Sequence, residues 1–415
     1  MAARPSARPG AEARLEHGAV PAALEPRGGS RPRRRRRDLL RVPAARRRRP
    51  QHAPPRHHTA TGDPRQDRCR RPLGAVERHH PAGAVPGGAR VTAPVIGLIG
   101  AGGIAQVHLP GWLSLGFEVV VHSLDGNAPE LTGRLGGRVA ASLDELLERA
   151  DIVDVVTPTG AHRELVERAA AAGRHIVCEK PLALTAADAA AMIAACERAG
   201  VRLFPAHVVR YFPAYAALHE AVASGRVSAP AVQRFFRIGA RPQTPWYLDR
   251  ARSGGIAMDQ MIHDFDQARW IVGEVEAVFA TQSGDETTTS TTVQAMLRHR
   301  SGAITHVNGV WGAETLDFHT GFSAAGPGWL LEHDSLRHPI LQLHGRADAG
   351  GPAYLPPVSA ATSPYTAELA DFAAAIRDGG PARVSADDGL HAVRIAAAVN
   401  RSLAQNAEVT VEETP

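Results

Sequence analysis

Lys180 is the residue whose type and position most directly suggest chemistry, because it is the only lysine among 47 basic residues. It lies in Cys178-Glu179-Lys180-Pro181, after an apolar run that predicts a buried parallel strand. A compact ammonium that can lose its proton stabilises a developing alkoxide, which the oxidation of a secondary alcohol requires. The alternative is a surface lysine in a loop. Since the chain uses arginine where charge alone suffices, the single lysine favours the catalytic role.

Asp259 and His263 form a second candidate pair, four residues apart on a helix predicted over residues 255–272. This spacing puts both side chains on one helix face, where the carboxylate can accept a hydrogen bond from one imidazole nitrogen. The other nitrogen can then face a substrate and shuttle a proton near neutral pH. The alternative is a surface or capping contact without function.

Four residues near this pair are expected to have structural or pocket-lining roles. Asp266 and Arg269 have the spacing of a structural ion pair. Trp246 and Tyr247 precede the helix and either line a sugar-sized pocket or are core aromatics.

The remaining histidines show no metal-ligand spacing, so the sequence predicts no metal.

A glycine-rich turn, Gly100-Ala101-Gly102-Gly103-Ile104-Ala105, follows the first predicted strand and opens a helix. The first glycine permits a tight turn, and the second lets a dinucleotide pyrophosphate approach the helix N-terminus. Such turns also occur for plain packing. In this strand-to-helix context we expect Gly100, Gly102, Gly103 and Ile104 to bind a dinucleotide.

The end of the second predicted strand bears on the choice between NAD and NADP. Ser123 stands where an acidic residue would hold a free ribose 2′-hydroxyl, and Asp125 follows two residues later. A neutral serine removes repulsion against a 2′-phosphate, for which Arg134 could supply a counter-charge, while Asp125 could equally hold the ribose. Both cofactors therefore stay open.

The elements that position these residues alternate between strands and helices from Val95 onward. This alternation predicts a doubly wound parallel sheet with ligands at the carboxyl ends of its strands. The strands are expected at 95–99, 118–122, 152–156, 175–178 and 201–206, and the helices at about 104–115, 142–150, 161–172 and 185–200.

After about residue 213 the pattern changes to longer strands with fewer helices, which predicts an α+β domain around a mostly antiparallel open sheet. Residues 300–302 are expected to join two of its strands as a hairpin, and residues 347–363 to form a loop. The strands are expected at 234–239, 275–282, 291–298 and 303–311, and the helices at 255–272, 367–377 and 387–404. The domains are thus expected at 91–212 and 213–415.

Residues 1–90 differ from the rest of the chain, since they contain 22 arginines against 7 acidic residues. They show no apolar periodicity, so we expect a disordered Arg/Pro-rich extension. A polycation for nucleic acid or membrane and a targeting peptide are alternatives, as is a true start near Val91. Residues 91–415 are acidic, so basic charge predicts no nucleic-acid partner for the folded part.

Cysteine usage indicates the compartment. Only Cys69, Cys178 and Cys196 occur, without a CxxC pair, which suits a reducing cytoplasm without structural disulfides. No apolar run is long enough to span a bilayer, so no membrane association is expected.

Several motifs in order resemble the Gfo/Idh/MocA oxidoreductases, the glucose–fructose oxidoreductase and inositol dehydrogenase family. The resemblance covers about Val95 to the C-terminus, more loosely after Trp311. It is carried by residues 97–108, Val156-Thr157-Pro158-Thr159, His162, Glu179-Lys180-Pro181, Gly254-Gly255, Asp259, His263 and Asp266.

The resemblance implies a Rossmann domain, a sheet domain that often forms a homo-oligomer interface, and a sugar, cyclitol or related polyol substrate. It implies a catalytic set of Lys180, Asp259 and His263, with His263 as acid and base. It also implies that Thr157, Pro158, Glu179 and Lys180 line the cofactor cleft. Ser123 departs from members that have an acidic residue there.

The leading hypothesis is therefore an NAD(P)-dependent oxidoreductase that transfers a hydride between nicotinamide and a polyol. A redox-neutral glycosidase of the same fold is one alternative, which an absence of net cofactor turnover would reveal. A non-catalytic dinucleotide-binding regulator is another, but such a protein needs none of the three catalytic candidates.

Overall fold

The computed structural model describes residues 94–284, 290–337, 341–345 and 362–412, all of which belong to the unit Val85–Pro415. The predicted extension 1–90, Cys69 and nearly all of the predicted loop 347–363 lie outside the described residues. In the part described, no helix is long and apolar enough to cross a membrane.

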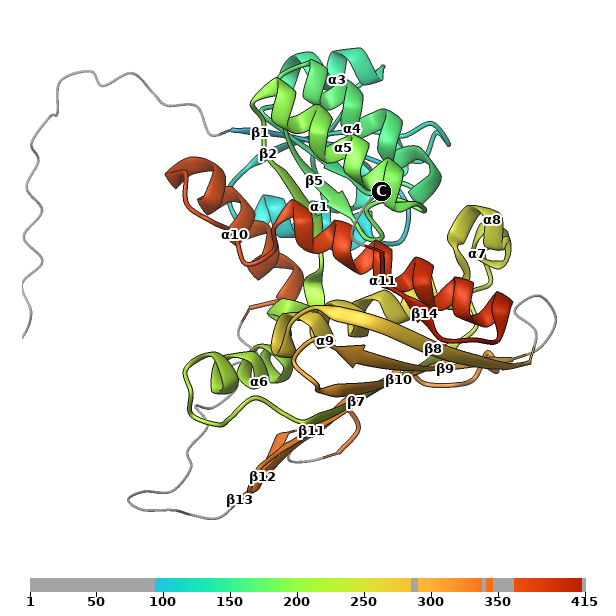
Figure 1. Cartoon of the computed structure of the whole chain (residues 1–415). Helices are drawn as coiled ribbons and strands as arrows, with labels where there is room; N and C mark the ends of the chain where they lie inside the picture. Colours follow the sequence, from blue (N-terminus) through green and yellow to red (C-terminus); the bar gives the residue numbers. More distant parts are fainter. Residues whose placement is uncertain (1–93, 285–289, 338–340, 346–361, 413–415) are drawn as a thin grey trace, which may run out of the picture. The chain divides into compact units, whose positions relative to one another are not determined.

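A six-stranded parallel sheet forms the N-terminal part, in the order β3-β2-β1-β4-β5-β6 (Figure 1). The strand order reverses between β1 and β4, and in open parallel sheets the carboxyl ends of the strands at such a point are where ligands bind. The strands are β1 (Val95–Ile99), β2 (Glu118–His122), β3 (Arg138–Val139), β4 (Ile152–Val155), β5 (His175–Glu179) and β6 (Leu203–Ala206). The doubly wound sheet is confirmed; only the two-residue β3, which has no apolar run, was not expected.

Helices follow these strands and cover the sheet. Thr185 caps α5 by accepting a hydrogen bond from the Asp188 amide at 3.0 Å, and Gly200 ends the helix in the left-handed region, as predicted. The helical segments are α1 (Ala105–Ser114), α2 (Ala128–Leu135), α3 (Leu143–Arg149), η1 (Thr159–Ala161), α4 (His162–Ala171), α5 (Ala186–Ala199), η2 (Val208–Tyr211) and α6 (Pro213–Ala223).

The second sheet is mixed and mostly antiparallel, in the order β13-β12-β11-β7-β10-β9-β8-β14, with β7 and β10 parallel. The predicted hairpin joins β9 to β10. The strands are β7 (Val232–Ala240), β8 (Val275–Gly284), β9 (Thr291–His299), β10 (Ile304–Gly312), β11 (His319–Gly326), β12 (Trp329–Asp334), β13 (Leu341–Gly345) and β14 (Val409–Thr410). Strands β11 to β14 were not expected, because β11 is rich in glycine and alanine and β14 is very short.

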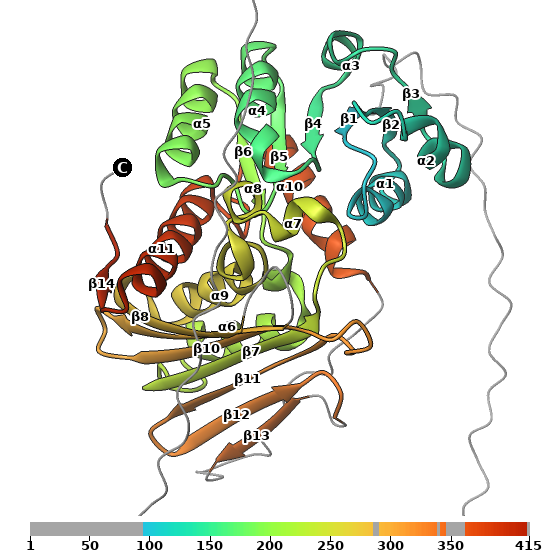
Figure 2. The same cartoon turned by 90° about the vertical axis from the view of Figure 1, so that its right-hand side faces the viewer.

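One face of this sheet is covered by helices (Figure 2). They are α9 (Ile262–Val272), which continues from the π-helical turn η3 (Ala257–Met261), and α11 (Ala386–Gln405). The remaining helices are the short α7 (Pro245–Leu248) and α8 (Arg250–Ser253), and α10 (Pro364–Asp378), which packs against α1. The C-terminal helices therefore join the two sheets.

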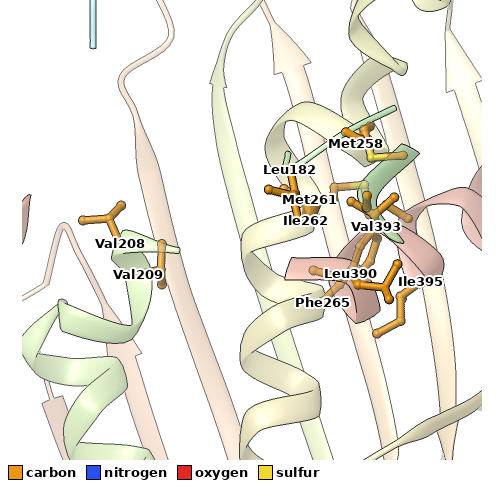
Figure 3. Close-up of a cluster of buried hydrophobic side chains, with 14 of the residues drawn as sticks. Leu182, Val208, Val209, Met258, Met261, Ile262, Phe265, Leu390, Val393 and Ile395 are labelled. Atoms are coloured by element: carbon orange, nitrogen blue, oxygen red, sulfur yellow. The ribbon is translucent and has the colours of Figure 1, made fainter. Parts of the chain in front are cut away.

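A buried apolar cluster lies where the two sheets meet (Figure 3). Leu182 follows Lys180 by two residues, Met258 precedes Asp259, and Met261 and Ile262 precede His263; all four side chains are buried in this cluster. Burial of each such side chain stabilises the fold by roughly 1.5–3 kcal/mol. The chemistry-bearing residues are thus held by apolar neighbours in the sequence.

The expected ion pair between Asp266 and Arg269 is wrong. Asp266 instead accepts hydrogen bonds from Arg210, at 2.6 and 2.8 Å, and Arg269 pairs with Asp388 at 2.6 Å and Glu274 at 2.7 Å. Arg210 and Asp266 are both buried, and a guanidinium from another segment satisfies the carboxylate with two parallel bonds. Spacing along one helix permits a contact but does not select it.

Candidate active site

Lys180 follows β5 directly and extends toward the second half of the chain. Its Nζ donates hydrogen bonds to the main-chain oxygen of Asp259 at 2.7 Å and to the Asp259 Oδ1 at 3.2 Å. The Lys180 side chain is 16% exposed and the Asp259 side chain is 18% exposed, so both side chains remain accessible to a small molecule. The structure thus brings together two predicted catalytic residues that lie 79 positions apart.

The expected hydrogen bond between Asp259 and His263 is absent. Asp259 is bound to Lys180, and the Nδ1 of His263 is buried without a partner among the described residues. Asp259 lies in the π-helical turn over Ala257–Met261, where its main-chain and carboxylate oxygens accept hydrogen bonds from Lys180 rather than from the imidazole four residues on. Such turns are frequent at functional sites.

His263 is held in its neutral form. Burial, and then the positive charges of Lys180, Arg237 and His207, lower the pKa of His263 well below its ordinary value. Arg237 is itself buried in an ion pair with Asp264 at 2.7 Å. A neutral imidazole has a free lone pair, so His263 can accept a proton at neutral pH.

The turn over residues 100–105 fits a dinucleotide pyrophosphate. Gly100 has a φ of 115°, and a Cβ there would lie 2.7 Å from the Val156 carbonyl oxygen, so only glycine fits. A Cβ at Gly102 or Gly103 would meet no atom within 4 Å, which leaves open space beside the helix. Ile104 precedes α1 without a side-chain cap, and the first turn carries no acidic residue. These features suit an anion at the helix N-terminus.

Ser123 and Asp125, the two residues considered for binding the adenosine ribose, have different contacts in the loop after β2. The Ser123 hydroxyl accepts a hydrogen bond from the Ala128 amide at 3.0 Å and so caps α2. The exposed Asp125 binds Asn127 through both carboxylate oxygens, at 3.1 and 2.8 Å. Arg134 lies in the last turn of α2, at the opposite end of that helix from Ser123.

The turn Thr157-Pro158 is tied to the lysine loop by His162. This buried imidazole contacts the Thr157 oxygen at 2.9 Å with one nitrogen and the Pro181 oxygen at 3.0 Å with the other. The Thr157 hydroxyl oxygen is buried and has no partner among the described residues. The roles of Thr157 and Pro158 toward a cofactor stay predictions.

Glu179 has contacts that the sequence did not indicate. Its Oε2 accepts the Lys180 amide at 2.9 Å, and its Oε1 lies 3.3 Å from the His108 Nε2. His108 also binds Asp154, which stands in the middle of β4. A carboxylate inside the apolar run Ile152-Val153-Asp154-Val155 was the signal that could have revealed this cluster, because such a charge needs a buried partner. His108 was noticed only as the end of the family fingerprint.

Among the described residues, no group of three or more His, Cys, Asp or Glu side chains could hold a metal ion. The expectation of a metal-free reaction stays a prediction.

The doubly wound sheet, the open glycine turn and the Lys180–Asp259 contact together define a dinucleotide-dependent oxidoreductase. The chain belongs to the Gfo/Idh/MocA family. Residues 95–207 match the model described as "Oxidoreductase family, NAD-binding Rossmann fold", and residues 215–321 match the "GFO/IDH/MocA C-terminal domain". The family and the NAD cofactor class predicted from the sequence are confirmed.

Known proteins resemble the chain over most of its length. Myo-inositol 2-dehydrogenase of Thermotoga maritima is 32% identical over 335 residues, 77% of this chain and 98% of that protein. The 1,5-anhydro-D-fructose reductase of Ensifer adhaerens is 30% identical over 330 residues, 76% of this chain and 98% of that protein. A levoglucosan dehydrogenase in complex with NADH and levoglucosan has a TM-score of 0.70 at 24% identity, over 78% of this chain and 100% of that chain, which shows the shared fold.

Proposed function

We propose that this protein is an NAD-dependent dehydrogenase or reductase that interconverts a secondary alcohol and a ketone on a sugar, cyclitol or related polyol. The observation that carries the proposal is the Lys180–Asp259 contact at the carboxyl end of a parallel strand, close to a neutral His263. Relatives named for inositol and anhydrofructose support the substrate class.

In this proposal the side chains handle the proton and the charge. NAD, when bound, supplies the hydride acceptor. The Lys180 ammonium stabilises the oxygen on which negative charge develops, and Asp259 keeps that ammonium in place. His263 removes the hydroxyl proton during oxidation and returns it during reduction.

Two stacked aromatic rings support a polyol pocket. The rings of Trp246 and Tyr247 lie 3.8 Å apart, on the segment that precedes the catalytic turn. Burial, and then the negative charges of Asp259 and Glu179, raise the pKa of Tyr247 to about 12. The Tyr247 hydroxyl therefore stays protonated at neutral pH, and it lies near Asp259, the residue that binds Lys180. A neutral hydroxyl can hydrogen-bond a sugar hydroxyl, and a ring face can pack against its carbons.

For the cofactor we propose NAD over NADP. The Asp125 carboxylate is exposed in the loop after β2, where it would repel a 2′-phosphate and accept a ribose hydroxyl. Arg134, the counter-charge considered for NADP, lies in the last turn of α2, at the far end of that helix from the loop after β2.

The test is a panel of sugars, cyclitols and polyols with NAD and NADP in parallel, followed by nicotinamide absorbance. We expect net NAD turnover with at least one member. Cleavage of a glycoside without net turnover would contradict the proposal and identify a redox-neutral glycosidase. Tight NAD binding with no reaction on any member would contradict it in favour of a regulator.

We also propose that the protein is a homo-oligomer through the face of the second sheet that α9 and α11 leave open (Figure 2). Phe279, Met296 and Ile304 are 37–38% exposed, and Phe279 lies opposite Met296 in the β8–β9 pairing. Large apolar side chains gathered on a sheet face mark interaction surfaces. Light scattering should give a multiple of the chain mass, reduced to one chain by Met296→Asp; a monomeric unmodified protein would contradict this.

Two further expectations belong to the same proposal. The buried free thiols of Cys178 and Cys196 support a reducing cytoplasm. The two family matches support a division into a dinucleotide-binding domain over 91–212 and a substrate and oligomerisation domain over 213–415. Cell fractionation tests the compartment, and recovery outside the cytoplasm would contradict it. Limited proteolysis tests the division: residues 1–90 are expected to be cleaved as a disordered extension, so only preferential cleavage within 91–415 at a place other than residue 212 would contradict it.

A further inference from the structure

A cluster of buried ionisable side chains lies behind the lysine loop. Its members are His108 from α1, Asp154 from β4, Glu179 at the end of β5 and Glu368 from α10, and none is more than 7% exposed. Burying charges this deeply costs several kcal/mol for each ion unless they are paired. The proposed hydride transfer does not use any of these groups directly, so the cluster calls for a separate explanation.

His108 joins two carboxylates. Its Nδ1 lies 2.9 Å from the Asp154 Oδ2, and its Nε2 lies 3.3 Å from the Glu179 Oε1, an ion-pair distance without hydrogen-bond alignment. An imidazole can offer a proton on both nitrogens only as a cation. Although burial alone would lower it, the charges of Asp154 and then Glu179 raise the pKa of His108 well above its ordinary value.

Asp154 anchors this imidazole. Its Oδ2 accepts a second hydrogen bond from the Trp112 indole nitrogen at 2.7 Å. Trp112 is fully buried on α1, one helical turn after His108. One end of the imidazole is therefore fixed to β4, and the other end faces Glu179.

Glu179 connects His108 to Lys180 through its two carboxylate oxygens. While Oε1 faces His108, Oε2 accepts the main-chain amide of Lys180 at 2.9 Å. The Lys180 side chain leaves from this same residue toward Asp259. A rotation of the Glu179 carboxylate would therefore move the backbone from which the ammonium is aimed.

We propose that His108 is a positioning residue: its contact with Glu179 fixes the carboxylate that holds the Lys180 amide and so aims the Lys180 ammonium at the reacting oxygen. The inference rests on the proposed function for its catalytic consequence, but the geometry that it assigns to Lys180 can be measured without turnover. A displacement of about 1 Å at a catalytic group costs on the order of 100-fold in rate.

Glu368 provides a control inside the same cluster. Both of its oxygens are buried without a partner among the described residues. Burial, and then the nearby charge of Glu179, raise the pKa of Glu368 well above its ordinary value, so this carboxyl is neutral. Glu368→Gln replaces one neutral group by another of the same shape and should leave the Lys180 loop unchanged.

Two substitutions at His108 separate its two contacts. The amide of His108→Asn can reach the Nδ1 position and keep Asp154, whereas the amide of His108→Gln can reach the Nε2 position and keep Glu179. Both remove the positive charge and should lower thermal stability alike. We expect kcat to fall about tenfold or more in His108→Asn and by less than about threefold in His108→Gln, with unchanged NADH affinity in both.

Equal loss of kcat in the two variants, or an equal loss in Glu368→Gln, would overturn the proposal, because the cluster would then act only by packing. The retention of kcat in His108→Gln, which keeps the contact with Glu179, is a result that a merely structural role of His108 would not give.

A second readout does not depend on activity. Since Lys180 is the only lysine, protein grown with carbon-13 lysine gives one Cε resonance in a heteronuclear NMR spectrum. We expect this resonance to shift or broaden in His108→Asn and to stay near its wild-type position in His108→Gln and Glu368→Gln. An unmoved resonance in His108→Asn would overturn the inference. An inactive wild-type protein with the expected NMR pattern would instead reject the proposed function alone.

Discussion

The ammonium of Lys180 is held by Asp259 through two oxygens, the main-chain carbonyl at 2.7 Å and the carboxylate Oδ1 at 3.2 Å. The π-helical turn over Ala257–Met261 presents both oxygens to the end of β5. The lysine at the end of one sheet is therefore held by the helical segment that covers the other sheet.

This double contact predicts unequal effects of two substitutions at Asp259. Asp259→Asn keeps an oxygen acceptor for Lys180, whereas Asp259→Ala leaves only the main-chain oxygen. We expect kcat to fall about tenfold in the asparagine variant and about 100-fold in the alanine variant, because the ammonium becomes misplaced. Steady-state kinetics at saturating NAD measures both, and equal losses would contradict a positioning role for the carboxylate.

His263 predicts the acid limb of the pH profile. Burial and the neighbouring cations lower the pKa of His263, so the neutral base persists as pH falls and is lost only below the ordinary histidine value of about 6.5. The kcat for alcohol oxidation should therefore stay constant through about pH 6.5 and decrease only at lower pH. His263→Gln should lose about 100-fold in kcat together with this limb. A limb centred above pH 6.5 that involves His263 would contradict this role.

Asp125 predicts the cofactor preference. Its removal in Asp125→Ala should raise the KM for NAD at least about tenfold, since a hydrogen bond to a charged group contributes about 1.5–3 kcal/mol, and should lower the KM for NADP because the repulsion of the 2′-phosphate is gone. Thr132→Val is the control, because the Thr132 hydroxyl on α2 contacts the main-chain oxygens of Ala128 and Pro129 and should affect stability without affecting preference. Parallel loss with both cofactors would show that Asp125 does not read the ribose.

The buried pair Arg210–Asp266 predicts a large effect on stability. Both side chains are at most 2% exposed, and Arg210 also pairs with Asp388 at 3.1 Å. Asp266→Asn removes the ionised partner with the two shorter contacts and leaves Asp388 as the second one, so it should lower the free energy of unfolding by about 1.5–3 kcal/mol. Urea denaturation measures this change. Glu167→Gln, which breaks an exposed pair with Arg163, is the control and should leave the midpoint unchanged. A comparable midpoint in both variants would contradict a structural role for the pair.

Local patterns were sufficient to predict much of the fold and part of the site. Apolar runs such as Val95–Ile99 locate the parallel strands, and the glycine turn after β1 opens α1 as expected. Lys180 and Asp259 were both expected in the site, but their direct contact joins residues 79 positions apart and depends on how the two sheets pack together. Residue spacing along the sequence could not predict contacts at the place where the two sheets meet.

The failures share a physical cause. Asp259 and His263 were paired by α-helical spacing, but the Asp259 carboxylate binds Lys180 from another segment. Asp266 and Arg269 were paired in the same way, but each found a stronger partner from another segment. His108 was missed because its importance comes from two carboxylates on different strands, which become neighbours only in the folded chain.

Single-turnover reduction of NAD by a polyol from the panel, with wild type and Lys180→Arg compared, tests the central claim most directly. Arginine keeps the positive charge but cannot place a compact ammonium between Asp259 and the reacting oxygen. We predict that the hydride-transfer rate falls by at least about 100-fold while NAD affinity is unchanged. A Lys180→Arg protein that reduces NAD at the wild-type rate would contradict the account.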